Sequence, residues 1–157
     1  VMGINALVNG GKLIPPTFLK RTREEALQVT KQVVKPETSV SLRYMMRLNA
    51  EKGTARKADV KGYYIGGKTG TSEKVVNGRY SQTKYIGNFV GMAPMSDPRF
   101  VIAVMIDEPG GPVHVGGDVA GPVFSALAAN ALRAKNITPD STLTHIIIPD
   151  NAAQEKM

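Results

Sequence analysis

The 157-residue sequence contains no cysteine, so neither a disulfide nor a cysteine-ligated metal can contribute to its fold. A lack of cysteine fits a bacterial protein outside the cytoplasm, although many cytosolic proteins share it. The two histidines, His114 and His145, lack the spacing of paired metal ligands. We therefore expect no metal site and place both histidines on the surface.

Aromatic residues are also scarce, at 6% of the sequence, and no base-stacking motif is present. The net charge of +7 would otherwise suggest an anionic partner such as nucleic acid. The basic residues are scattered, with small clusters at Lys20–Arg23 and Arg56–Lys61. This distribution favours a solvated surface, and we expect no nucleic-acid partner.

No apolar run is long enough to span a membrane, and the first residues lack the basic region of a signal peptide. Val1–Ala6 instead resembles the middle of a helix. With 42% apolar residues, the chain can build one sizeable core. We expect it to be a segment of a longer protein that begins inside a domain.

Helical and strand patterns alternate in a simple order along the chain. We expect helices at 1–9, 36–49 and 121–135, where proline starts and glycine stops agree with a 3.6-residue apolar repeat. Strands are expected at about 62–71, 84–94 and 99–107, with an Asn77-Gly78 turn between the first two. This order predicts an α+β fold, an antiparallel sheet with helices packed on it.

Three details of this fold are also predicted. The apolar run Phe100–Ile106 suits a strand covered on both faces, and Met92 and Met95 are expected in the core. The polar residues 72–84 are expected to form a loop beside a cleft, either as a mobile cover or as an ordinary hairpin loop. Residues 150–157 form a polar tail after a domain that spans 1–149.

Gly62–Thr69 formally matches the G-x-x-x-x-G-K-T phosphate loop of nucleotide hydrolases. A phosphate loop requires an apolar strand before it and a helix after it. Here the preceding residues 56–61 are charged, and the Asn77-Gly78 turn follows. We interpret the match as a coincidence.

The same residues have a better interpretation as the edge of a strand beside a cleft. Lys68 supplies a fixed positive charge, and Thr69 and Thr71 offer hydroxyls to a substrate carboxylate. Gly70 lets an acyl group lie against the backbone, and the Thr71 N–H is a candidate donor to a tetrahedral oxyanion. Taken alone, these residues could equally solvate an edge strand.

Further short motifs surround Lys-Thr-Gly, which is one of the three motifs of serine penicillin-recognising enzymes. They are Gly53-Thr54-Ala55 with Gly62-Tyr63, Asn77-Gly78-Arg79-Tyr80, Phe89–Pro94, Asp97-Pro98-Arg99, Ile106–Pro109 and Gly116–Phe124. Together these motifs resemble class B penicillin-binding proteins, and most closely the division-type (septal) transpeptidases. The resemblance covers most of residues 1–140.

The resemblance implies a penicillin-binding transpeptidase fold and a peptidoglycan D,D-transpeptidase that β-lactams acylate. Lys68 and Thr71 would be catalytic: Lys68 would point toward the serine of the family's Ser-x-Asn motif, and the Thr71 amide would lie in the oxyanion hole. Thr69, Gly70 and Ser72 would bind substrate. No cofactor or metal is implied.

Two motifs of the family are missing. The sequence contains no Ser-x-Asn, and its one S-x-x-K, Ser81–Lys84, follows Lys-Thr-Gly instead of preceding it. The family's nucleophile begins a buried helix, with its lysine one turn later, whereas a strand is expected at Tyr85. We therefore reject Ser81 as nucleophile and expect this C-terminal part of the domain to be inactive alone.

Two other functions remain open: a β-lactamase, which shares Lys-Thr-Gly, and a non-catalytic module that binds a peptide or a partner strand. The resemblance also implies a periplasmic protein anchored in the bacterial inner membrane. Its expected partners are peptidoglycan stem peptides, β-lactams, the missing N-terminal part of its own domain and other cell-division or cell-wall synthesis proteins.

Overall fold

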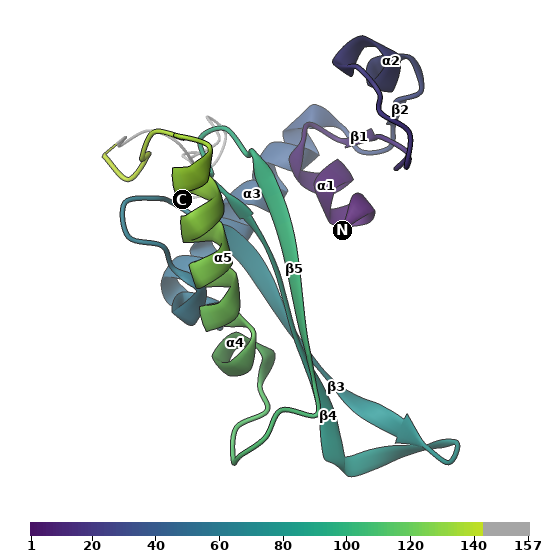
Figure 1. Cartoon of the computed structure of the whole chain (residues 1–157), viewed down its shortest axis with the longest axis vertical. Helices are drawn as coiled ribbons and strands as arrows, with labels where there is room; N and C mark the ends of the chain where they lie inside the picture. Colours follow the sequence, from purple (N-terminus) through teal and green to yellow (C-terminus); the bar gives the residue numbers. More distant parts are fainter. Residues whose placement is uncertain (143–157) are drawn as a thin grey trace, which may run out of the picture.

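The computed structural model describes residues 1–142, and its centre is a three-stranded antiparallel sheet in the order β3-β4-β5 (Figure 1). The strands are β3 (Gly66–Val76), β4 (Arg79–Ala93) and β5 (Phe100–Asp107). The register runs without a break from Gly66↔Met92 to Glu73↔Tyr85, and β5 pairs along the other edge of β4. The predicted α+β fold with an antiparallel sheet is confirmed.

The prediction of a polar loop at residues 72–84 was wrong, because β3 and β4 continue through this segment as a two-stranded ribbon. The ribbon projects beyond β5 (Figure 1). The turn lies at Asn77-Gly78, as expected, and both residues have a positive φ, 51° and 77°. Such angles favour asparagine and glycine and match the twist of a tight hairpin. The ribbon is solvated on both faces, so its polar residues resembled a loop.

The three predicted helices are present as α1 (Met2–Val8), α3 (Pro36–Lys52) and α5 (Gly121–Ala134). α3 begins at Pro36 and continues almost a turn past Asn49, and Gly53 ends it. Pro122 occupies the first turn of α5, where a missing backbone N–H has no consequence.

Several short elements were not predicted: β1 (Lys12–Leu13), α2 (Arg23–Gln28), β2 (Lys31–Gln32), η1 (Arg56–Ala58) and α4 (Gly116–Val119). The sequence does carry a signal for α2. The Thr22 hydroxyl accepts the Glu25 N–H at 3.2 Å, and the Glu25 carboxylate accepts the Thr22 N–H at 2.8 Å. This capping box can be recognised in the sequence as a threonine that is followed three residues later by a glutamate.

The main core lies between α5 and one face of the sheet. Phe124, Ala128 and Leu132 form a buried stripe on α5, and Phe124 packs on Phe89 of β4 with ring centroids 4.7 Å apart. The predicted apolar face of α5 is thus only partly buried, since Val123 and Leu127 are exposed. Figure 1 shows α5 along one side of the sheet, and the fainter α3 passes behind the strands.

A second, smaller cluster covers the opposite face, and only at one end of the sheet. Met92 and Met95 are buried there against Val8 of α1, which confirms both methionines as core residues. The rest of this face is open: Ala103 is exposed, and Met105 is 69% exposed. The prediction that β5 is covered on both faces therefore fails for the described chain. The predicted polar tail 150–157 and His145 lie outside the described residues.

Candidate active site

The predicted Lys-Thr-Gly strand is β3, the outer strand of the sheet, and α3 holds its first residues from outside. The Asn49 amide donates to the Gly67 carbonyl at 2.9 Å, and the Arg47 guanidinium donates to the Ile65 carbonyl at 3.1 Å. Since Thr69 is followed by strand and not by helix, the phosphate-loop interpretation is excluded.

The pairing register sorts the predicted site residues onto the two faces of the sheet. Thr69 pairs with Phe89 and Thr71 with Gly87, so both threonines share the face that α4 and α5 cover. Lys68, Gly70 and Ser72 alternate onto the opposite face, and Lys68 and Ser72 are exposed there. The five residues lie along one stretch of the sheet edge. The lysine side chain belongs to one face of this edge, and the two threonine hydroxyls belong to the other.

Lys68 curls around this edge. Its ammonium donates to the Thr69 carbonyl at 2.6 Å, which places the charge at the outer margin of the strand. The Gly67 and Thr69 carbonyls both bond outward, to Asn49 and Lys68. Backbone groups along a strand alternate in direction, so the Thr71 N–H also points outward. An N–H with this direction can donate to a group that lies outside the sheet.

Both threonine hydroxyls have partners that the sequence did not reveal. The Thr69 hydroxyl lies 2.8 Å from that of Thr54, whose own N–H donates to the Asn49 side chain at 3.1 Å. The Thr71 hydroxyl accepts the Gly116 N–H at 2.9 Å. A hydroxyl that accepts one hydrogen bond keeps its proton for another acceptor, so Thr71 can still donate to a carboxylate.

Two glycines let α4 approach the strand closely enough for this contact. A Cβ on Gly116 would lie 2.2 Å from the Gly70 carbonyl oxygen, and one on Gly117 would lie 2.2 Å from the Thr54 carbonyl oxygen. Any side chain at either position would push α4 off the site. The Gly116-Gly117 pair was recognisable in the sequence, but its role depends on packing.

A hollow of about 470 Å³ opens beside the site on the uncovered face of the sheet. Its wall includes Lys68 and Gly70 of β3, Asn88 and Val90 of β4, and Met105 of β5. The wall is mostly apolar apart from the lysine and the asparagine. The charged edge of β3 therefore borders an apolar surface that the described residues leave open.

An exposed charge cluster ties the ribbon to the end of β5. The Lys74 ammonium lies 2.9 Å from the Asp107 carboxylate and 2.7 Å from that of Glu108, and Lys84 approaches Glu108 at 3.2 Å. The hydrogen bonds that Lys74 donates to Glu108 and then to Asp107 raise the pKa of Lys74. The hydrogen bonds that Glu108 accepts from Lys74 and then from Lys84 lower the pKa of Glu108. Strand alternation does not separate the two carboxylates, because β5 ends at Asp107 and Glu108 has a φ of 47°.

The S-x-x-K candidate lies on a strand. Ser81 belongs to β4, and its hydroxyl oxygen accepts the N–H groups of Thr83 and Lys84. It therefore lacks the helical placement that would aim a lysine at it.

His114 stacks on Tyr85 with ring centroids 3.8 Å apart and is half-buried. Within residues 1–142, no three metal-ligating side chains gather, and no helix is both long and apolar enough to cross a bilayer.

These features together define an open strand edge on an antiparallel α+β sheet, where a lysine and two threonines lie within four residues. The sequence matches the family model of the penicillin binding protein transpeptidase domain over residues 2–129, and the chain belongs to this family. The resemblance to class B penicillin-binding proteins is confirmed.

Similar proteins include a probable peptidoglycan D,D-transpeptidase, PenA, of Neisseria flavescens and stage V sporulation protein D of Bacillus subtilis. They are 38% and 36% identical to this chain, each over 88% of its length. The solved transpeptidase domain of penicillin-binding protein 3 from Burkholderia pseudomallei is 41% identical, with a TM-score of 0.77 over 88% of this chain. The chain spans 34% and 23% of the two curated relatives and 42% of the solved domain.

Proposed function

We propose that this chain is the C-terminal part of a peptidoglycan D,D-transpeptidase that cross-links stem peptides through a serine acyl-enzyme. Residues 1–149 belong to the transpeptidase domain, and 150–157 are its polar tail. The observation that carries the proposal is the open edge of β3. There the Lys68 charge, the Thr71 hydroxyl and the outward Thr71 N–H lie along four residues, in a chain of the transpeptidase family.

Each group of the edge has a defined task in this reaction. A serine oxygen attacks the carbonyl carbon of the penultimate D-alanine, and the C–N bond to the terminal D-alanine breaks as that residue leaves with a proton. Thr69 and Thr71 bind the terminal carboxylate, Gly70 and Ser72 line the peptide, and the Thr71 N–H donates to the oxyanion. The amine of a second stem peptide then displaces the serine and forms the cross-link.

Lys68 completes the site electrostatically. Its ammonium lies at the margin of the strand, where it can face a serine of the missing Ser-x-Asn motif and favour negative charge in the transition state. A β-lactam, whose carboxylate and strained amide mimic the peptide end, would acylate the same serine. This chain supplies the Lys-Thr-Gly strand, and another part of the domain supplies the nucleophile.

The position of Ser81 on a strand supports a nucleophile from another part of the domain, because the Ser81 oxygen already accepts two backbone N–H groups. A β-lactamase with the same strand would release its acyl group quickly, whereas a transpeptidase holds a penicilloyl adduct. A non-catalytic module of the same fold would form no adduct. The lifetime of the adduct therefore separates the three functions.

We infer a bacterial periplasmic setting with the parent protein anchored in the inner membrane, since cross-linking of peptidoglycan takes place there. The partners follow from the reaction: stem peptides, β-lactams and the rest of the domain, with other cell-division or cell-wall synthesis proteins around it. The curated relatives named above support this setting through their names alone.

The proposal is tested by D-alanine release from a pentapeptide ending in D-alanyl-D-alanine, using the full-length protein that contains this chain. Lys68→Ala is expected to slow release roughly hundredfold, the usual scale for one preorganised electrostatic group. Lys61→Ala is the matched control, since Lys61 is an exposed lysine just before the site. Equal turnover in the Lys68 variant and the wild type would contradict the assignment of the site.

A further inference from the structure

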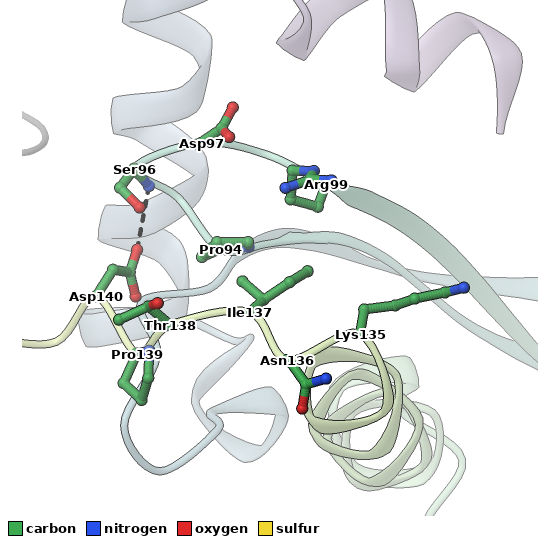
Figure 2. A pocket seen from close by; sticks show the side chains of 10 residues that line it. All are labelled: Pro94, Ser96, Asp97, Arg99, Lys135, Asn136, Ile137, Thr138, Pro139 and Asp140. Atoms are coloured by element: carbon green, nitrogen blue, oxygen red, sulfur yellow. Dashed lines mark hydrogen bonds between the residues drawn. The ribbon is translucent and has the colours of Figure 1, made fainter.

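A carboxylate far along the chain from the site is almost completely buried. Asp140 is 2% exposed, and a buried charge is unfavourable unless hydrogen bonds replace its water. One of its oxygens accepts the Tyr64 N–H at 2.7 Å, and the other accepts the Ser96 N–H at 3.1 Å. Figure 2 shows the bond to Ser96 at one side of a pocket. Asp140 thus joins three separate stretches of chain.

Further bonds attach the segment after α5 to the residues that lead into β3. The Tyr64 hydroxyl donates to the Ser141 carbonyl at 2.9 Å, and the Ser141 N–H donates to the Gly62 carbonyl at 3.2 Å. The Tyr63 hydroxyl donates to the Ile137 carbonyl. Residues 137–141, which we call the clasp, therefore fasten both tyrosines.

The fastened residues lead directly into the candidate active site. Tyr64 precedes β3 by two residues and Lys68 by four, and its carbonyl accepts the Met95 N–H at 2.9 Å. Ile65 between them is fully buried. A small rotation or slip at Tyr64 would thus be passed along β3 to Lys68 and Thr71. Errors of about 1 Å at a reacting group can slow catalysis roughly a hundredfold.

We propose that Asp140 is a positioning residue for the Lys68–Thr71 edge: it fixes the entry of β3 against the β4–β5 turn and so sets where the ammonium and the Thr71 N–H lie. This inference rests on the proposed function for its catalytic consequence. Its structural consequence, the order of residues 64–71, stands independently.

The pocket beside the clasp contains a residue that serves as a matched control. The pocket has a volume of about 350 Å³, and its lining includes a second carboxylate, Asp97, on the β4–β5 turn (Figure 2). Asp97 is exposed, and no hydrogen bond or ion pair links it to another described residue. Asp140→Asn and Asp97→Asn remove the same charge from the same pocket, but only the first disturbs the clasp.

The test measures two quantities on the full-length protein: acylation by a fluorescent penicillin and deuterium exchange of backbone amides. In Asp140→Asn we expect acylation to be about tenfold slower. Exchange should be faster in peptides covering 64–71 and unchanged in α5. Asp97→Asn should match the wild type in both measurements. Asp140→Asn keeps the shape of the side chain, so it is the primary variant, with Asp140→Ala as the larger change.

The outcomes separate this inference from the proposed function. If the wild type is not acylated, the proposed function fails, while exchange at 64–71 still decides the role of Asp140. Unchanged exchange and acylation in folded Asp140→Asn would overturn the inference. Equal loosening of the whole chain would also overturn it, because it would show a general contribution to stability.

Discussion

Thr71 combines more of the proposed chemistry than any other residue of the edge. Its hydroxyl accepts the N–H of buried Gly116, its proton remains available to a carboxylate, and its own N–H points outward. The Thr71 hydroxyl oxygen therefore couples the position of α4 to the site. Side-chain and backbone roles at this residue can be separated by substitution.

Thr71→Val keeps the shape of the side chain but removes the acceptor of the Gly116 N–H. A buried donor without a partner costs about 1–3 kcal/mol, so we expect the free energy of unfolding to fall by that amount in denaturant titrations. Thr71→Ser keeps the oxygen and should stay within about 0.5 kcal/mol of the wild type. Equal stability of the valine and wild-type proteins would show that the Gly116 contact contributes nothing.

At the residue scale, the sequence predicted which residues form the candidate site but not how they are arranged. Lys68, Thr69, Gly70 and Thr71 were identified from residue chemistry and family motifs. Asn49 and Thr54 form hydrogen bonds to this strand. In the sequence, Asn49 was recognised only as part of a helix and Thr54 only as part of a family motif. Their contacts depend on how α3 lies against β3, and no local pattern in the sequence encodes that packing.

The ribbon of β3 and β4 beyond β5 is the element with the least support from a core. A two-stranded ribbon is marginally stable by itself, and here Lys74 links it to Asp107 and Glu108. The stacked pair of Tyr85 and His114 adds a contact at its base. The order of the ribbon should therefore depend on charge.

The pKa shifts set the pH range over which this cluster stabilises the ribbon. The lowered pKa of Glu108 means that its contribution is present above the ordinary value of 4.5 and is lost as pH falls through the folded value. The raised pKa of Lys74 means that its contribution is present below the ordinary value of 10.5 and is lost as pH rises through the folded value. The cluster is fully effective between those limits.

We therefore predict that Glu108→Gln loosens the ribbon at neutral pH and has little effect in strong acid. Amide exchange of residues 72–84 at both pH values would measure the difference, which should shrink in high salt. Glu73→Gln is the control, because the Glu73 side chain belongs to the same ribbon but not to the cluster. A similar effect of both variants would argue against a specific role of Glu108.

Helices and strands with a clear apolar repeat were predicted well, whereas short or fully solvated elements were not. The limits of α3 and α5 followed from Pro36, Gly53 and Pro122, and the turn followed from Asn77-Gly78. The extent of the ribbon was missed because neither of its faces is apolar. α4 has four residues and depends on its contacts with β3 and β4, not on its own sequence.

The whole molecule combines one covered face of the sheet with one that is mostly open. α5 covers the first, whereas α1 and α3 cover only one end of the second. Met105 and Ala103 are exposed beside the hollow next to Lys68. Open apolar surface of this kind promotes association.

We predict that this chain alone self-associates through the open face. Met105→Lys should lower its apparent mass in sedimentation experiments and should weaken its binding to the upstream part of the domain. Val123→Lys is the control: it places the same charge at an exposed apolar position of α5, away from the hollow. If the two variants behave alike, the open face of β5 is not the surface responsible.

The central claim is that this chain supplies one half of an acyl-enzyme site and that the nucleophile lies elsewhere in the domain. Intact mass after incubation with penicillin tests it most directly, on this chain alone and on this chain co-expressed with the segment that precedes it. The account predicts an adduct only on the upstream polypeptide, and only when both are present. An adduct on this chain itself would contradict the account and restore Ser81 as the nucleophile, and a folded complex without any adduct would favour the non-catalytic module.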